Sequence, residues 1–379
     1  MELKSLQRHI RSLATLPETS AQVVSCYLEL EKGGIKDPAV FHEQVHHLTT
    51  GLAGQERQDF KAAMAAIQRY LAVELSADAK GAAIFSRAGA APFFLPLQFR
   101  LPLPNWVTLQ TTPNIYHLVE LKDAYDRYIL MFCTEKKVWI LEVNLGAVTK
   151  ELWRERVEIR GRVGRDWTKA QYQRHQKKHN QTLLTEMIYF LDRRISEGGF
   201  IHLILAGDPK IMKQVRDQLP KHLIAKLSKM LSAPSGKPTL GVVAESISSF
   251  VETEQKKSHA VGAELADQLC TGGLAVAGSA ATIEALQRGQ VDMLVLAEGY
   301  RAEPGLRCET CSLIHAKQDK TTTCSNCGSS DLRDLDMREE MVRLAVQYGA
   351  TVEVVPDHDV LMRFGGVGCL LRYRWSEAP

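Results

Sequence analysis

The sequence lacks any uninterrupted apolar run that approaches the roughly 20 residues needed to span a bilayer. Its first residues, MELKSLQRHIRSL, also lack the continuous apolar stretch of a signal peptide. They instead place apolar side chains on one helix face with charges between them, at Leu3, Leu6, Ile10 and Leu13. A composition of 45% hydrophobic and 24% charged residues is typical of a soluble globular protein. We therefore expect no membrane partner.

Several common catalytic and nucleotide-binding motifs are also missing. The sequence contains no G-x-S-x-G nucleophile elbow and no H-E-x-x-H metalloprotease motif. The segment SAPSGKPT resembles the end of a phosphate loop, but Pro238 occupies the required Ser/Thr position and Leu231 the required first glycine. These absences argue against the corresponding hydrolase and nucleotidase classes.

Disulfide-rich architecture is not expected either, because the eight cysteines are used in a different way. Four of them are scattered in apolar contexts, which suits a reducing cytoplasm: Cys26, Cys133, Cys270 and Cys369. The other four form two Cys-x-x-Cys knuckles with the spacing C-x2-C-x12-C-x2-C: Cys308, Cys311, Cys324 and Cys327. This spacing suits tetrahedral zinc, since each short knuckle places two sulfurs on one ion.

The zinc hypothesis is supported by the residues between the two knuckles. SLIHAKQDKTTT is too polar to form a core of its own, and a metal ion would replace that core. A redox pair and a coincidental spacing are the alternatives. His315 lies within the loop and could replace one ligand, although four cysteines already complete the shell. A closed shell leaves no position for a catalytic water, so we expect a structural Zn²⁺.

The net charge of +3 is small, but its distribution is uneven. From Lys150 to Lys178 the sequence has ten Lys and Arg residues against four Asp and Glu. A run this basic in a nearly neutral chain indicates a polyanionic partner, which favours nucleic acid. The alternative is a solvated helix face, which would usually carry evenly mixed charges.

A chain of 379 residues is too long for one ordinary core, and we expect three α/β domains. They are an N-terminal α/β domain over residues 1–121 (α+β in character), a layered α/β domain over 122–258, and a three-layer α/β domain over 259–379. The zinc ribbon is expected as an insert at 305–335. The sequence contains no internal repeat.

Individual elements can be predicted within these domains. Strands are expected at Val23–Leu30 and Gly81–Arg87, and one long helix from Asp37-Pro38 towards Leu75. RYILMFC and VWILEVNLG predict a hairpin. After the strand Phe200–Gly207 we expect a helix from Asp208-Pro209 through Leu231, followed by a strand at TLGVVAE. Asp336 and Glu339 form the pattern of a capping box.

Three segments together resemble the archaeo-eukaryotic class-I peptide release factors and their relative Pelota. They are GRVGRDWTKAQYQRHQKKHNQ, GGFIHLILAGDPKI, and GLAVAGSAATIEALQRGQVDMLVLAEGY with the ribbon and GGVGCLLRYRW. The first is similar to the family's GRGGQ loop and the Arg-rich helix after it. The resemblance covers roughly residues 122–379 and is nearest to the divergent bacterial members, which include the hibernation factor Balon. It implies a C-terminal domain like that of a ribosomal protein, which in relatives docks a translational GTPase.

The departures from the family pattern change the function that is expected. Counting back from His179-Asn180, the family's Gly-Gly-Gln falls on Val163-Gly164-Arg165. Val163 is β-branched where glycine permits unusual dihedrals, and Arg165 places a cation where the water-positioning group belongs. The family's stop-codon-reading N-I-K-S motif is absent as well. We therefore do not expect termination activity.

The retained scaffold indicates a ribosome-binding protein that occupies the A site in hibernation or rescue without hydrolysis. Its RNA contacts are expected from a basic loop and the helix after it, at Arg160, Arg162, Arg165, Lys169, Arg174, Lys177 and Lys178. One alternative is a peptidyl-tRNA hydrolase or tRNA-cleaving enzyme that uses other residues of the same segment, namely Asp166, His175 and His179. A second alternative is an RNA-binding protein with no ribosomal role.

Overall fold

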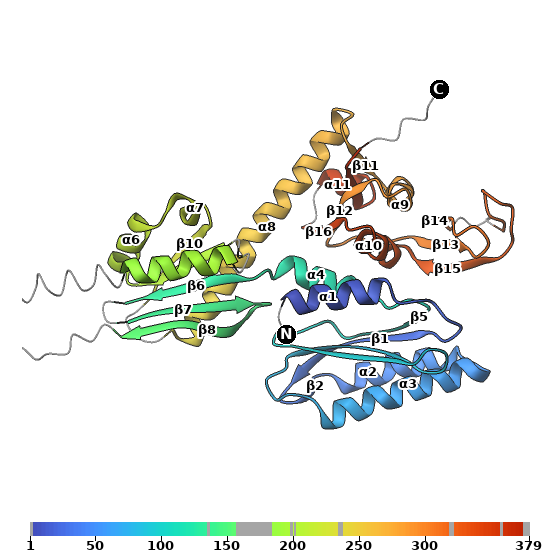
Figure 1. The fold of residues 1–379 in the computed structure, drawn as a ribbon. Helices are drawn as coiled ribbons and strands as arrows, with labels where there is room; N and C mark the ends of the chain where they lie inside the picture. Colours follow the sequence, from blue (N-terminus) through green and yellow to red (C-terminus); the bar gives the residue numbers. More distant parts are fainter. Residues whose placement is uncertain are drawn as a thin grey trace, which may run out of the picture. The chain divides into compact units, whose positions relative to one another are not determined.

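The fold is taken from a computed structural model of the whole chain, shown as a ribbon in Figure 1. The structure describes residues 3–134, 137–156, 184–197, 200, 202–233, 238–317, 322–356 and 359–373. The mixed α/β class expected from the sequence is confirmed, because these residues form four separate sheets and the helices that cover them. No helix among these residues combines the length and the apolar character needed to cross a membrane.

The chain divides into two compact units. The first unit joins Leu3–Ala124 to Glu254–Pro379, and the second is Tyr125–Thr253. The first and the last of the three predicted domains thus lie in one compact unit. The predicted domain boundaries at 121/122 and 258/259 stay a prediction.

The N-terminal part of the first unit is built on an antiparallel sheet. Its central strand, β1 (Val23–Glu31), pairs with β3 (Gly81–Arg87) on one side and with β5 (Trp106–Gln110) on the other. β4 (Phe93–Phe99) continues the sheet beyond β3, and the short β2 (Gly34–Ile35) pairs with the end of β1. Pro96 lies in β4, which is an edge strand, and an edge is where a sheet tolerates proline.

Helices cover one face of this sheet (Figure 1). They are α2 (Pro38–Thr50) and α3 (Gly54–Val73), and the expectation of one helix from Asp37 to Leu75 was therefore wrong. The break falls at Gly51, which has no side chain to pack and ends α2, and α3 then begins at a second glycine. Alternate residues of β1, among them Val24, Cys26 and Leu28, share a core with the buried side chains of these two helices.

The opposite face of β1 is covered by α4 (Tyr116–Ala124) and α1 (Leu3–Ala14), which contact each other. The hydroxyl of Tyr27 on this face donates to the carbonyl of Asn114, at 2.6 Å, just before α4 begins. Both helices also contact α10 (Met337–Gln347) of the C-terminal part. β1 is therefore buried on both faces, which explains its nearly continuous apolar sequence.

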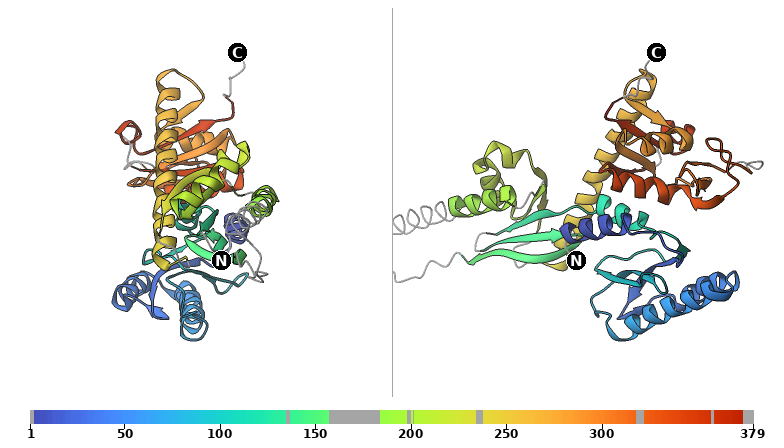
Figure 2. Two further views of the ribbon diagram at one scale, coloured as in Figure 1. Left: turned by 90° about the vertical axis from the view of Figure 1, so that its left-hand side faces the viewer. Right: turned by 45° about the vertical axis from the view of Figure 1, so that its right-hand side comes forward.

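The C-terminal part contains a four-stranded sheet in the order β11-β17-β12-β16. Its strands are β11 (Ala275–Ala277), β17 (Val367–Leu371), β12 (Val291–Ala297) and β16 (Thr351–Val355), and only the β12–β16 pair is parallel. α9 (Ser279–Gln287) and α10 contact this sheet and each other, and the short α11 (Asp359–Arg363) precedes β17. A separate three-stranded sheet is inserted between β12 and α10: β13 (Pro304–Cys308), β14 (Ile314–Ala316) and β15 (Leu332–Asp336). Figure 2 shows this insert in orange to red, at one end of α10.

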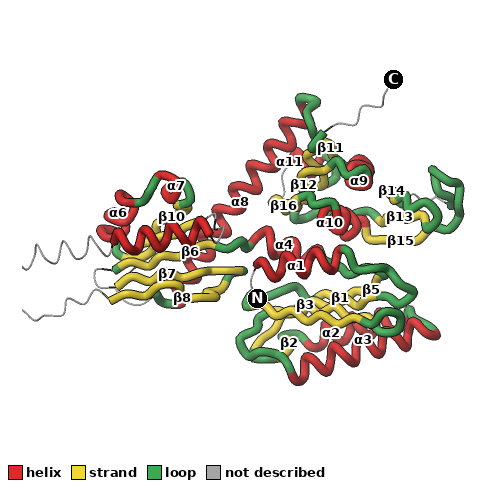
Figure 3. Tube along the Cα trace, in the orientation of Figure 1, coloured by secondary structure: helices red, strands yellow, loops and turns green. Residues whose placement is uncertain are grey.

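The second unit is a five-stranded sheet in the order β10-β9-β6-β7-β8, visible with its helices in Figure 3. The predicted hairpin is confirmed as β6 (Tyr128–Cys133) and β7 (Lys137–Asn144), with β8 (Ala147–Arg156) added beside it. β9 (His202–Gly207) runs parallel to β6 and to β10 (Leu227–Ser232). One face packs against α6 (Pro209–Gln218), α7 (Lys221–Ile224) and a helix over residues 184–197.

The other face of this sheet is covered by α8 (Leu240–Cys270), whose Phe250 stacks on Tyr128 with ring centroids 4.9 Å apart. Two expectations fail here. The helix predicted to continue through Leu231 ends at Gln218. The short α7 and then strand β10 follow it. TLGVVAE, predicted as a strand, leads into and begins α8, since a 31-residue helix outweighs the weak strand preference of two valines.

One buried and one partly buried carboxyl group join α4 to the C-terminal part of the first unit. Glu339 of α10 is 2% exposed and accepts hydrogen bonds from the N–H groups of Ile115, at 2.5 Å, and Tyr116, at 3.1 Å. At the other end of α4, Asp123 accepts from the N–H of Val354 in β16, at 2.8 Å. Burial, opposed by these two N–H groups, raises the pKa of Glu339 to about 8.

The Asp123 carboxyl is expected to make the stability of the first unit depend on pH. Burial and then the like charge of Glu353 raise the pKa of Asp123 to about 8, although the N–H of Val354 opposes this. Its ordinary pKa is about 4, so between these values the folded state binds a proton that the unfolded chain has lost. The free energy of unfolding should therefore fall as pH rises through this window, by at most about 1.4 kcal/mol per pH unit for this group.

Asp123→Asn should flatten that dependence, because its amide can still accept from the N–H of Val354 and carries no titrating proton. Thermal unfolding followed at several pH values between 4 and 8 measures the effect. Asp37→Asn, at an exposed carboxyl of the same unit, is the control and should leave the slope unchanged. A slope in Asp123→Asn equal to that of the unsubstituted protein would contradict the prediction.

Candidate metal centre

The two predicted knuckles come together in the structure. Cys308 is the last residue of β13, and Cys324 and Cys327 lie in the turn before β15. Cys311 completes the set, and the Sγ atoms of all four cysteines lie within 4.8 Å of one another. Two Sγ–Sγ distances, Cys308 to Cys327 and Cys311 to Cys324, are 3.5 Å. The four cysteines could therefore hold one metal ion.

The two knuckles have the same backbone conformation. In the first, the N–H of Ser312 donates to the carbonyl of Cys308, at 2.8 Å, and the N–H of Cys308 donates to the carbonyl of Leu313, at 2.9 Å. The second knuckle, which begins at Cys324, repeats both bonds at the same sequence spacing, at 2.9 and 2.8 Å. The residue after the second cysteine has a positive φ in each knuckle, 60° at Ser312 and 74° at Gly328. Such repeated turns direct two thiols of each knuckle towards one point.

The electrostatics of the thiols suits a cation. The N–H of Cys311 lowers the pKa of the Cys308 thiol, and the N–H of Leu313 lowers that of Cys311 to about 6. At Cys327 the N–H of Ser329 also favours a lower pKa. The neighbouring thiols outweigh it, and the pKa of Cys327 is raised to about 12. Four thiolates at these distances repel one another, and a metal ion would remove that repulsion and allow all four to ionise.

His315, the possible substitute ligand, is placed outside the group. It lies in β14, and its Nδ1 is 3.2 Å from the carbonyl oxygen of Ala316. The candidate ligand set found among the described residues consists of the four cysteines without His315. The donor set is thus four sulfurs in a closed shell, which is the arrangement of a structural rather than a catalytic metal site.

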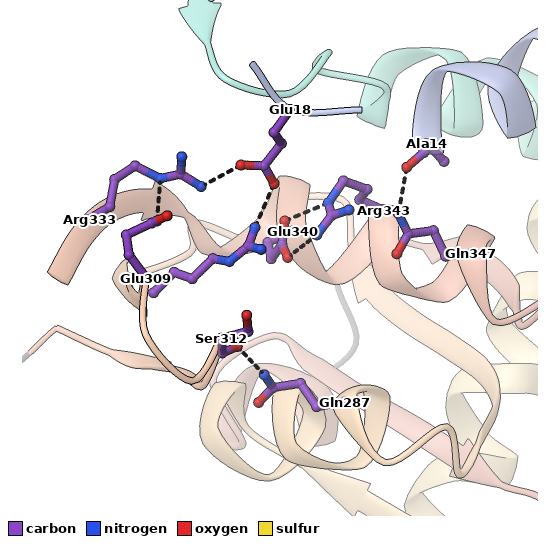
Figure 4. A network of polar contacts seen from close by, with 10 residues as sticks. Ala14, Glu18, Gln287, Glu309, Ser312, Arg333, Glu340, Arg343 and Gln347 are labelled. Carbon is purple, nitrogen blue, oxygen red and sulfur yellow. Dashed lines mark hydrogen bonds and ion pairs between the residues drawn. The ribbon is translucent and has the colours of Figure 1, made fainter. Parts of the chain in front are cut away.

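Charged side chains anchor the ribbon to the N-terminal part of the same unit (Figure 4). The carboxylate of Glu18 binds two arginines of the ribbon, Arg307 at 2.6 Å and Arg333 at 2.8 Å. Arg333 also pairs with Glu309, which lies within the first knuckle between Cys308 and Cys311, at 3.2 Å. Burial alone would raise the pKa of Glu18, but hydrogen bonds and charge from Arg333 and Arg307 outweigh it, and the pKa is lowered.

A second contact supports the first knuckle directly. The side-chain amide of Gln287, at the end of α9, donates to the carbonyl of Ser312, at 3.2 Å. No local sequence pattern predicts this bond or the Glu18 pairs, because the partners lie between 25 and 315 residues apart.

The predicted RNA-binding residues lie outside the described residues, between the end of β8 and the helix over residues 184–197. The same holds for Val163-Gly164-Arg165 and for the alternative enzymatic residues Asp166, His175 and His179. The whole set of predicted contacts is Arg160, Arg162, Arg165, Lys169, Arg174, Lys177 and Lys178. The structure places the two ends of this segment on the second unit, at β8 and at a helix packed on the same sheet.

Comparison with known proteins gives two family matches. Residues 113–249 match bacterial archaeo-eukaryotic release factor family 10, and residues 256–375 match eRF1 domain 3. A peptide chain release factor subunit 1 from Thermococcus onnurineus is 31% identical over an alignment of 120 residues, and the match covers 27% of this chain. The chain spans less than a third of that relative, 29% of its length.

The matches to two solved structures cover nearly the whole chain. The archaeal translation termination factor aRF1 is 16% identical, with 98% of this chain and 99% of that chain covered and a TM-score of 0.28. An archaeal Pelota, in a model of ribosome-bound Pelota and ABCE1, is 14% identical, with coverage of 99% and 95% and a TM-score of 0.42.

Cys308→Ser or Cys324→Ser should abolish metal binding and unfold the ribbon locally. One ligand is lost, and the polar loop between the knuckles has no other core. The main cooperative transition of a thermal melt should persist, because β13–β15 form a sheet of their own. Elemental analysis and calorimetry measure both effects.

Cys270→Ser is the matched control, because Cys270 is exposed and lies outside the cluster. It should keep both metal and melt. Loss of the whole transition in Cys308→Ser would show that the ribbon is not a separate outgrowth.

Proposed function

Because the chain belongs to the archaeo-eukaryotic release factor and Pelota superfamily, we propose that it is a ribosome-binding translation factor. It occupies the A site during hibernation or rescue and does not hydrolyse peptidyl-tRNA. The two family matches, which together span most of residues 113–375, carry this proposal. The name of the curated relative, a peptide chain release factor, supports a role in translation.

The sequence at the family's catalytic triplet supports a factor without hydrolytic activity. Val163 and Arg165 stand where the family has glycine and glutamine. A β-branched residue restricts the backbone, and a guanidinium is no general base near neutral pH, so neither side chain would position or activate a water.

Charge supports ribosomal RNA as the partner. The segment from Lys150 to Lys178 has an excess of six positive charges, and it is rich in arginine, which suits phosphate forks and base stacking. Residues 161–165 would approach the peptidyl-transferase region, and the C-terminal part would contact the ribosomal stalk base or a translational GTPase. Ribosome binding, together with the reduced cysteines, suits a cytoplasmic location.

The metal of the ribbon is proposed to be Zn²⁺ with a structural role. Zinc prefers four thiolates in tetrahedral geometry, and the paired knuckles supply four thiols at mutual distances that one ion can bridge.

Ribosome binding should be sensitive to salt and to the basic segment. Purified protein should co-sediment with 70S ribosomes, and an Arg162→Glu/Arg165→Glu variant should bind at least tenfold more weakly, with a smaller salt slope, because phosphate contacts release counterions. Arg193→Glu/Arg216→Glu, at exposed arginines of the same unit, is the control for net charge. An unchanged affinity and salt slope in the Arg162/Arg165 variant would count against the proposal.

The same ribosomes, loaded with peptidyl-tRNA, test whether the factor is inert. Incubation should leave both the peptidyl ester and the tRNA intact. Release of peptide, or a shortened tRNA, would instead support the enzymatic alternative, and Asp166→Asn, His175→Gln and His179→Gln would then identify the residues responsible.

Protein purified under reducing, chelator-free conditions should contain one zinc ion per chain. Removal of the ion with a chelator should lower the thermal stability of the ribbon, and Zn²⁺ should restore it where Mg²⁺ does not, since Mg²⁺ prefers oxygen ligands. Stoichiometric iron, or no metal at all, would contradict the assignment.

A further inference from the structure

The helix α1 carries cations but no carboxylate over Leu3–Ala14. Lys4, Arg8 and Arg11 are exposed, and their spacing of four and then three residues places them on one face of the helix. At a rise of about 1.5 Å per residue, successive cations lie roughly 4.5–6 Å apart along the axis. This face presents a stripe of positive charge, which we name the α1 stripe.

The cations of the α1 stripe have no ion-pair partner among the residues that the structure describes. Acidic residues of two neighbouring segments are already engaged: Glu18 follows α1 in the chain, and Glu340 lies in α10, which contacts α1. Glu18 binds Arg307 and Arg333, and Glu340 of α10 binds Arg343. The positive charge of the stripe is therefore available to another molecule.

A pocket of about 190 Å³ continues the stripe at its C-terminal end. It lies between α1, α4 and the α10–β16 turn, and its described lining includes Gln7, Arg11 and Lys122 but no carboxylate. Gly349 and Thr351 also line it. Lys122, like the stripe, has no ion-pair partner in the described part of the chain. The pocket thus offers two cationic side chains and an amide to one anionic group.

The burial of the apolar face of α1 decides between two kinds of polyanion, a membrane surface and a chain of phosphates. A basic amphipathic helix that lies on a membrane must insert its apolar side into the lipid. In α1 that side is already buried against the unit, at Leu3, Leu6, Ile10 and Leu13. The helix therefore has only its charged face free. Regularly spaced phosphates are the complement of such a face, and Arg and Lys bind them as forks and point charges.

We propose that the α1 stripe and the adjoining pocket form a second RNA-binding surface, which holds consecutive phosphates of a ribosomal RNA strand. This surface belongs to the first unit and is separate in sequence from the basic segment Lys150–Lys178. The inference rests on the proposed ribosomal function for the identity of the RNA, but its charge chemistry can be tested on free RNA as well.

Three proteins test the inference: the unsubstituted chain, a stripe variant and a matched control. The stripe variant carries Lys4→Glu, Arg8→Glu and Arg11→Glu. The control carries Arg57→Glu, Lys61→Glu and Arg69→Glu on α3, which makes the same charge change at exposed positions of a helix that also bears Glu56 and Asp59. Affinity for 70S ribosomes and for protein-free ribosomal RNA is measured at several salt concentrations. Thermal melts verify folding, and Lys4→Gln/Arg8→Gln/Arg11→Gln replaces the stripe variant if it unfolds.

The stripe variant should bind RNA at least tenfold more weakly, and its plot of log Kd against log salt should be shallower by about 2 to 3 units for three phosphates. The control should keep the slope of the unsubstituted chain. A stripe variant with unchanged slope and affinity on both ribosomes and free RNA would overturn the inference.

The experiment distinguishes a failure of this inference from a failure of the proposed ribosomal function. If the unsubstituted chain does not bind ribosomes, the A-site proposal fails, and free ribosomal RNA alone then decides on the stripe. Vesicles containing phosphatidylserine complete the test. Binding to vesicles that the stripe variant loses, without any RNA binding, would also overturn the inference in favour of a membrane surface.

Discussion

The buried carboxyl of Glu339 is the contact on which the arrangement of the first unit depends. It accepts the N–H groups of Ile115, which precedes α4, and of Tyr116, the first residue of α4, although more than 220 residues separate it from them. The first N–H groups of a helix have no partner within the helix, and burial without one would be costly. Glu339 therefore caps α4 from another part of the chain. The contact fixes α4, and with it α1, against α10.

The two candidate sites of this unit follow from that constraint. α10 begins directly after β15, so the cap on α4 also fixes the end of the ribbon from which the knuckles are built. Glu18, which follows α1, then reaches Arg307 and Arg333 and holds the ribbon from its other side. The apolar face of α1 is used in the same packing, which leaves its cations exposed. A structural metal site and a basic surface thus share one buried framework.

The sequence predicted local features well and long-range contacts poorly. Strands β1, β3 and β6 and the cysteine spacing are encoded within a few residues, and each was found where it was expected. The capping box was half right, because Asp336 accepts the N–H of Glu339, at 3.1 Å, as predicted, but the Glu339 side chain caps α4 instead. β10 and the start of α8 were assigned wrongly, since short apolar stretches have no decisive period. No local pattern indicates the Glu18 contacts.

Electron cryo-microscopy of the protein bound to 70S ribosomes that carry P-site tRNA would show whether the chain occupies the A site. We predict density for the chain in the A site, with residues 161–165 next to the peptidyl-transferase region and the peptidyl ester intact. Density on another ribosomal surface, with the A site empty, would contradict this prediction.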